Sequence, residues 1–252
     1  MSTAVRVQLC GRFAIVVDGR EVHPALPGRR ARLLVAYLAA HRNRPTARAQ
    51  LLEALWPNGS GDSAGATLSV LLSKVRTLIS PAEISGRGTL QLVLPSDALV
   101  DTERAVAALH QAESALAQQD WRRAWGPAQT AALIGGREFL MEYDEPWIDR
   151  VRVQCDLQYQ RALACYAEAC LRVGGSELPA AERSARRLIE RAPLSEIGYR
   201  LLMEVLVSRG DTAAALATYE HLRRAIRDEL GAAPGLALRR LHQELLHATD
   251  NT

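Results

Sequence analysis

Apolar and polar residues alternate at three places in the first hundred residues of the chain. The period is two over residues 5–9 and 13–17, and an Asp18-Gly19 pair follows. This pattern predicts short antiparallel strands joined by tight turns. The same alternation returns over residues 84–94, where Ser85-Gly86-Arg87-Gly88 is typical of a hairpin tip.

Between these strands the apolar spacing is helical. It runs through residues 28–41 and, after Thr46 as the predicted N-cap, through 46–57, where Pro57 stops the helix. Residues 66–80 form a third helix, with an apolar stripe of Leu68, Leu71, Leu72, Val75, Leu78 and Ile79. The opposite side carries Ala66, Val70, Ser73, Lys74 and Thr77, with Arg76 at its flank. We therefore expect one buried side and one small, lightly basic exposed side.

The predicted elements follow one another as sheet, helix, helix, polar loop, amphipathic helix and hairpin. This is the order of a winged helix-turn-helix domain, in which the third helix presents its outer face to the major groove of DNA. Small residues on that face let the backbone approach base edges, while basic residues meet phosphates. A small α+β domain without a ligand is the alternative interpretation.

The charge distribution favours the DNA-binding interpretation. Residues 1–100 contain 12 Lys and Arg against 6 Asp and Glu, whereas residues 101–252 contain 19 against 22. The first half therefore attracts anions and the second does not. The predicted DNA-binding residues are Arg29, Arg30, Arg32 and Arg48 near helix starts, Ala66, Thr67, Val70, Ser73, Lys74, Arg76 and Thr77 on the third helix, and Arg87 on the hairpin.

The sequence from Asp101 onward is rich in alanine and has helical spacing, with predicted breaks at glycines and prolines that include Gly126-Pro127. Small and aromatic residues recur, and Ala181 and Ala215 are 34 residues apart, which is the tetratricopeptide period. A longer helical insert is expected at 147–173. The predicted fold is mostly α: a winged-helix domain at 1–98, then an all-α, tetratricopeptide-like domain at 99–252.

Several classes of protein are disfavoured. The sequence has no P-loop, no GxSxG or HExxH motif and no dinucleotide-binding fingerprint, so we expect no catalytic residues and no cofactor. Asp144-Glu145 is expected to be a solvated turn. The four cysteines lack zinc spacing and are expected to be buried free thiols, without a metal site. The absence of a long apolar run predicts a cytoplasmic protein without membrane contact.

Motifs across nearly the whole chain resemble those of the Streptomyces antibiotic regulatory proteins, in which an OmpR-type winged helix precedes a bacterial transcriptional activator domain. The matching stretches are LCGRF at 9–13, VDGREV at 17–22, RRARLLVAYLA at 29–39, LLEALWP at 51–57, SKVR at 73–76, APLSEIGYRLLMEVLVSRGDTAAALATYE at 192–220 and DELGAAPG at 228–235. The chain departs from the family at Ser69, where members often carry arginine, and this departure concerns the base contacts.

The resemblance implies a transcriptional activator that binds promoter direct repeats, as a homodimer on DNA, and recruits RNA polymerase holoenzyme to an antibiotic gene cluster. The loop Asn58, Gly59, Ser60, Gly61 and Asp62 is similar in place to the loop that contacts polymerase in OmpR-type regulators, although an inert turn is the alternative. The other function considered is a protein-binding helical-repeat scaffold whose winged helix no longer binds DNA.

Overall fold

The chain was analysed as a computed structural model that describes residues 5–57, 59 and 63–250. It forms two compact units. Unit 1 comprises Met1–Val106 and Ile134–Asp156, and unit 2 comprises Ala107–Leu133 and Leu157–Thr252. The domain boundaries 1–98 and 99–252 stay a prediction, because they divide the chain into consecutive segments whereas unit 1 also contains a segment beyond residue 133.

Unit 1 opens with a small four-stranded sheet. Its strands are β1 (Val5–Gln8), β2 (Ala14–Val17), β3 (Arg20–Glu21) and β7 (Leu99–Val100), in the order β3-β2-β1-β7. β1 and β2 are antiparallel, with Val7 opposite Ile15. Asp18 and Gly19 join β2 to β3, and both have positive φ, as the predicted tight turn requires. The alternation in the sequence therefore predicts these antiparallel strands and this turn correctly.

A short 3-10 helix and three α-helices follow. They are η1 (His23–Ala25), α1 (Gly28–Ala40), α2 (Arg48–Leu55) and α3 (Ala64–Leu78). The core of unit 1 contains Leu34 from α1, Leu51 from α2 and Leu68 from α3, none of which is exposed to solvent. The helical spacing of the sequence is confirmed in all three α-helices.

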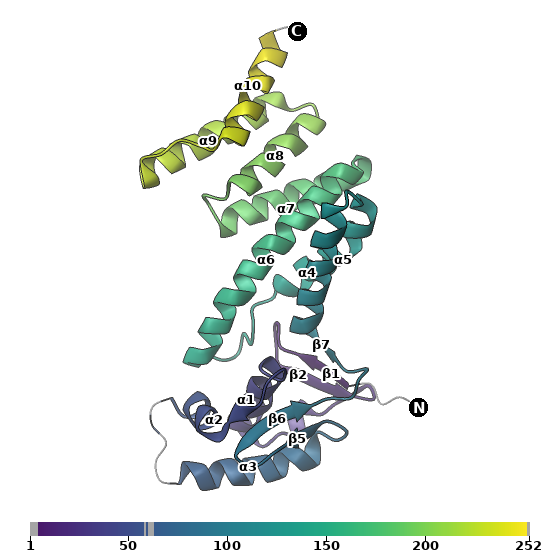
Figure 1. Ribbon diagram of the computed structural model, residues 1–252, viewed down its shortest axis with the longest axis vertical. Helices are drawn as coiled ribbons and strands as arrows, with labels where there is room; N and C mark the ends of the chain where they lie inside the picture. The colour runs from purple at the N-terminus through teal and green to yellow at the C-terminus, as the bar shows by residue number, and fades with distance from the viewer. Residues whose placement is uncertain (1–4, 58, 60–62, 251–252) are drawn as a thin grey trace. The chain divides into compact units, whose positions relative to one another are not determined.

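A three-stranded sheet closes the winged-helix fold. β5 (Glu83–Ser85) and β6 (Thr89–Val93) form the predicted hairpin, which lies beside α3 (Figure 1). β4 (Thr46–Ala47) pairs with the edge of β6 that faces away from β5. Thr46 is consequently not the N-cap of α2. It is buried and pairs with Leu90, and Ala47 takes the cap position, where its backbone N–H donates to Gln50 Oε1 at 3.1 Å.

The segment 134–156 packs on the winged helix within unit 1. Leu140 N–H donates to the Leu9 carbonyl at 2.7 Å, and Gly11 N–H donates to the Glu138 carbonyl at 2.7 Å. Arg152 stabilises the same segment internally, because its guanidinium donates to the carbonyls of Phe139, Leu140 and Tyr143. The end of β1 therefore gains a short paired neighbour from more than a hundred residues along the chain.

The remaining helices contain most of unit 2. They are α4 (Asp101–Ala117), α5 (Trp121–Gly135), α6 (Pro146–Val173), η2 (Gly175–Glu177), α7 (Leu178–Arg191), α8 (Glu196–Ser208), α9 (Thr212–Leu230) and α10 (Leu236–Asp250). The expected insert at 147–173 is the helix α6. The expected break at Gly126-Pro127 is wrong, because α5 continues through Pro127. Ala124 and Ala128 on the same helix are fully buried, and this packing offsets the backbone hydrogen bond that a proline cannot donate.

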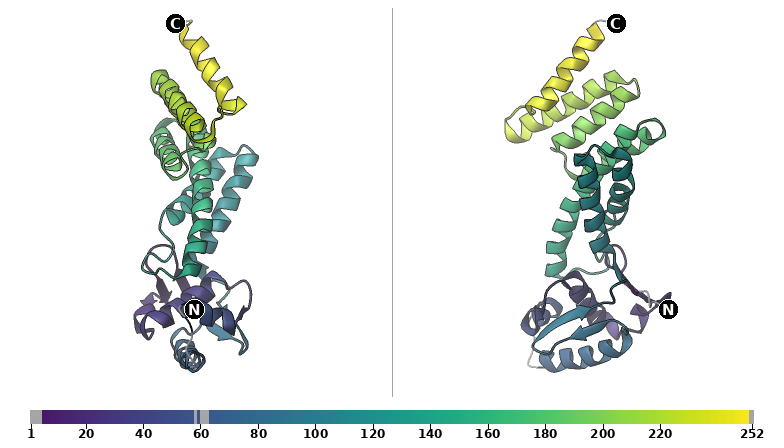
Figure 2. Two further views of the ribbon diagram at one scale, coloured as in Figure 1. Left: turned by 90° about the vertical axis from the view of Figure 1, so that its left-hand side faces the viewer. Right: turned by 45° about the vertical axis from the view of Figure 1, so that its right-hand side comes forward.

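Helices α7, α8 and α9 stack as consecutive antiparallel neighbours (Figure 2). Ala181 and Ala215 are fully buried where these helices meet. A Cβ on Gly198 would lie 3.0 Å from Ile189 Cγ1, so the start of α8 approaches α7 closely. The predicted fold class, a winged helix followed by a tetratricopeptide-like all-α region, is confirmed.

The cysteines are free thiols, and burial raises the pKa of Cys155, Cys165 and Cys170 to about 11. These thiols are therefore protonated at neutral pH. Among the described residues no group of His, Cys, Asp and Glu could hold a metal ion. No helix in the described part of the chain is long and apolar enough to cross a membrane.

Gly86 should be essential to the hairpin. Its φ is +88°, and a Cβ would lie 2.0 Å from the Thr89 carbonyl oxygen. Because the backbone must shift to admit a methyl group, Gly86→Ala should lower the free energy of unfolding by about 2 kcal/mol in urea titrations. Gly88→Ala is the matched control, since a Cβ there has no neighbour within 4 Å. Equal stability of the two variants would contradict this account.

Candidate nucleic-acid interface

The outer face of α3 is exposed as the sequence predicts. Leu68, Leu72 and Val75 are buried on its inner side. The exposed residues are Ala66, Thr67, Ser69, Val70, Ser73, Lys74, Arg76 and Thr77. Val70 is 54% exposed, an unusual fraction for a β-branched apolar residue in the middle of a helix. The side chains of this face are short and offer hydroxyl and methyl groups, which are able to contact base edges in the major groove.

The hydroxyl groups of this face differ in what they can offer a ligand. Thr67 Oγ1 donates to the Ser63 carbonyl and Thr77 Oγ1 to the Ser73 carbonyl, each at 3.0 Å. These two hydroxyls therefore present mainly acceptor lone pairs outward. The Ser73 hydroxyl donates no bond within the described chain and can serve as donor or acceptor.

Arg48 joins the start of α2 to the start of α3. Its guanidinium donates to the Gly65 carbonyl at 2.9 Å and to Ser69 Oγ at 2.6 Å. Its backbone N–H donates to the Gly88 carbonyl in the hairpin tip at 3.0 Å. Arg48 therefore lies at the meeting point of the two helices and the hairpin. Sequence reasoning missed this role of Ser69, which was noted only as a departure from the family pattern.

Arg76 lies at the flank of the exposed side of α3, and its guanidinium contacts the hairpin. Its Nε donates to the Ile84 carbonyl at 2.9 Å and its Nη2 to the Gly86 carbonyl at 2.8 Å. The guanidinium is thus bound to the hairpin backbone and fixes the hairpin against α3. Lys74, two residues before Arg76 and therefore at the opposite margin of the exposed side, makes no ion pair among the described residues, so its charge is open to an anion.

Arg87 is exposed at the hairpin tip, between β5 and β6. Among the described residues its side chain has no ion pair, so its charge faces solvent.

The proposed polymerase loop lies between α2 and α3. Gly59 is described and has a φ of +104°, but Asn58, Ser60, Gly61 and Asp62 lie outside the described residues.

The three arginines at the start of α1 have partners away from α3. Arg29 pairs with Glu145 and lies over the Tyr143 ring at 5.3 Å, and Arg32 also hydrogen-bonds Tyr143. Arg30 lies over the Trp56 ring at 5.0 Å. No hydrogen bond or ion pair in the described chain joins these arginines to α3. The structure thus gathers Arg48, Arg76 and the α3 residues with the hairpin, and Arg29 and Arg32 with the segment 134–156.

The expectation that Asp144-Glu145 is a solvated turn is wrong for Glu145. Its carboxylate is 6% exposed and is paired with Arg29. The sequence signal for this burial was the cluster of large apolar residues around it, since Phe139, Leu140, Tyr143, Trp147 and Ile148 are all buried. Trp147 meets Tyr37 of α1 edge to face at 4.9 Å. Burial raises the pKa of Tyr143 despite the two nearby arginines.

These features define a winged helix-turn-helix protein with a tetratricopeptide-like helical region and an open face on the third helix. The family described as bacterial transcriptional activator domain matches residues 100–246. The chain belongs to this family, and the resemblance to the Streptomyces antibiotic regulatory proteins is confirmed.

Similar curated proteins are named as regulators. The chain is 28% identical to regulatory protein AfsR of Streptomyces coelicolor, over 98% of this chain and 25% of AfsR. It is 27% identical to transcriptional regulatory protein EmbR of Mycobacterium tuberculosis, over 94% of this chain and 62% of EmbR. It is 29% identical to transcriptional regulator RedD of S. coelicolor, over 86% of this chain and 64% of RedD. The chain therefore spans a quarter of AfsR and less than two thirds of the other two.

A solved structure, M. tuberculosis EmbR in complex with a low affinity phosphopeptide, has the same fold. The TM-score is 0.85 at 22% identity, and the match covers 98% of this chain and 66% of that chain. At this identity the likeness concerns the fold alone.

The pair of Arg29 and Glu145 can be tested by a double-mutant cycle. Arg29→Met leaves a buried carboxylate without its cation, which is costly when fully desolvated. Because the Arg29 side chain is 58% exposed and screened by water, we expect a loss of about 1–2 kcal/mol in the free energy of unfolding. Adding Glu145→Gln should recover most of the loss. A double variant no more stable than Arg29→Met would show that the pair does not hold this segment.

Proposed function

We propose that this chain is a sequence-specific transcriptional activator that reads DNA with the outer face of α3. The observation that carries the proposal is the exposure of a face of small residues on α3. Beside it lies a hairpin whose tip carries Arg87, a residue without an ion pair among those described. Ala66, Val70 and Ser73 lie on that face without covering residues among those described. A duplex can therefore approach the helix backbone closely, and Val and Ala can contact thymine methyl groups.

Basic groups border this face on two sides. Lys74 lies on α3 itself, and Arg87 lies at the hairpin tip, where it is placed to enter an adjacent minor groove. Arg48 can add a phosphate contact through the guanidinium nitrogens that are not bonded to Gly65 and Ser69. Arg76 acts mainly on the hairpin. We assign sequence-independent affinity to Lys74, Arg48 and Arg87.

The remaining parts of the proposal rest on the family and on the named regulators among the relatives. Two copies bind tandem direct repeats in a promoter as a homodimer on DNA, and the loop 58–62 contacts RNA polymerase holoenzyme. The regulated genes belong to an antibiotic cluster. The tetratricopeptide-like helices supply a surface for protein partners, as stacked helix pairs commonly do.

Selection from a pool of random duplexes tests DNA reading directly. The full chain should enrich tandem direct repeats whose half-sites are about one helical turn, ~10 bp, apart. Substitution of Val70 by Glu, which places a carboxylate against the bases, should abolish the enrichment while leaving the urea midpoint unchanged. If the folded chain enriches no sequence but captures a protein partner, the scaffold function would replace this proposal.

Lys74→Ala should weaken binding to selected and unselected duplexes alike. One lost phosphate contact lowers the slope of log K against log salt by ~0.9 in magnitude. The measurement is fluorescence anisotropy at several salt concentrations. Arg122→Ala, an exposed arginine of α5, serves as the control and should leave the slope unchanged. An unchanged slope for Lys74→Ala would remove this lysine from the phosphate contacts.

The same salt titration of Arg29→Met decides whether Arg29 belongs to the residues that contact phosphate.

A further inference from the structure

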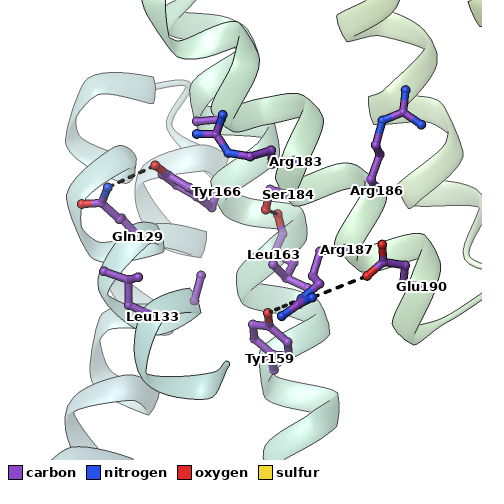
Figure 3. A pocket seen from close by; sticks show the side chains of 12 residues that line it. Gln129, Leu133, Tyr159, Leu163, Tyr166, Arg183, Ser184, Arg186, Arg187 and Glu190 are labelled. Atoms are coloured by element: carbon purple, nitrogen blue, oxygen red, sulfur yellow. Dashed lines mark hydrogen bonds and ion pairs between the residues drawn. The ribbon is translucent and has the colours of Figure 1, made fainter. Parts of the chain in front are cut away.

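Unit 2 contains a pocket of about 570 Å³ between α5, α6 and α7 (Figure 3). A volume between roughly 300 and 1,000 Å³ is typical of sites for small organic ligands. Neither the proposed DNA contact nor the packing of the helical repeat accounts for this pocket. All its lining residues lie within unit 2.

The lower wall of the pocket is apolar. Tyr159 and Leu163 of α6 are 6% and 4% exposed, which makes them a fixed surface. Leu133 of α5 lies at the mouth with 67% of its surface exposed, which is high for a leucine inside a helix. A ligand with an apolar body would remove this leucine from water and gain the corresponding hydrophobic free energy.

Three arginines of α7 also line the pocket, and their charges have different partners. Arg186 is paired with Glu182 at 2.9 Å and turns away from the other two in Figure 3. Arg187 donates to Tyr159 Oη at 3.4 Å and is paired with Glu190 at 3.6 Å. Arg183 has no ion pair among the described residues, and it extends over the pocket on the side of Tyr166.

The other polar groups are already hydrogen-bonded. Ser184 Oγ donates to the Leu163 carbonyl at 2.9 Å, and Gln129 Nε2 donates to Tyr166 Oη at 3.1 Å. The guanidinium of Arg183 is therefore the polar group at this pocket with the most unused donors. Three arginines against the single carboxylate of Glu190 give the lining an excess of positive charge.

We propose that this pocket binds a small organic anion, with an apolar ring or chain against Tyr159, Leu163 and Leu133 and its anionic group on Arg183. A planar guanidinium donates two parallel hydrogen bonds to a carboxylate or a sulfonate, which suits it to this role. The site is independent of the DNA-reading face, so the proposal does not rest on the proposed function.

The experiment uses anilinonaphthalene sulfonate as an anionic probe and N-phenylnaphthylamine, a similar aromatic amine without the sulfonate, as the neutral control. Fluorescence titration of the full chain should give saturable binding of both probes. Arg183→Gln should weaken the anionic probe about fivefold and change the neutral probe less than about twofold, because only the charge contact is lost. Leu133→Ser should weaken both probes.

Arg122→Gln, on α5 outside the pocket lining, is the matched control and should change neither affinity. Equal urea midpoints of all variants establish that the probes do not report unfolding. The proposal is overturned if the folded chain shows no saturable binding, if Arg183→Gln binds the sulfonate as the unaltered chain does, or if Arg122→Gln weakens it equally.

Discussion

The burial of one side of α3 is the constraint on which the rest of the interface depends. Leu68, Leu72 and Val75 are at most 3% exposed, and each contributes roughly 1.5–3 kcal/mol when it is removed from water. Rotation of the helix by one residue, about 100°, would turn this stripe away from the core and bury either Lys74 or Arg76, depending on the direction of the rotation. The hydrophobic core therefore fixes the orientation of the outer face, although no residue of that face takes part in the core.

In unit 1, arginines of equal charge have different roles because the groups around each of them differ. Arg76 is bound by two hairpin carbonyls, Arg29 by a carboxylate 116 residues away, and Arg87 by no partner among the described residues. A guanidinium whose donors are used within the fold has fewer left for a phosphate. Net charge alone therefore overstates how many arginines of this unit are available to an external anion.

Local patterns in the sequence were sufficient for the helices, the hairpin and the exposed side of α3, because each depends on residues a few positions apart. They failed where a distant segment competes. Thr46 has the chemistry of an N-cap, but pairing with Leu90 in β6 places it inside a strand. A proline normally interrupts a helix, but α5 continues through Pro127 because the alanines on either side of it are packed in the core. Glu145 is polar and adjacent to a proline, yet Arg29 stabilises it in a buried position.

The hairpin tip is held from two directions, and this determines how Arg87 is presented. The Gly86 carbonyl accepts from Arg76 at the end of α3, and the Gly88 carbonyl accepts from the backbone of Arg48 at the start of α2. Arg87 lies between these two fixed carbonyls. Its backbone is therefore ordered when the protein folds rather than when a ligand binds, which reduces the conformational entropy lost on association. The side chain alone remains to be ordered, because these two contacts fix the backbone on either side of Arg87 and leave its guanidinium open to solvent.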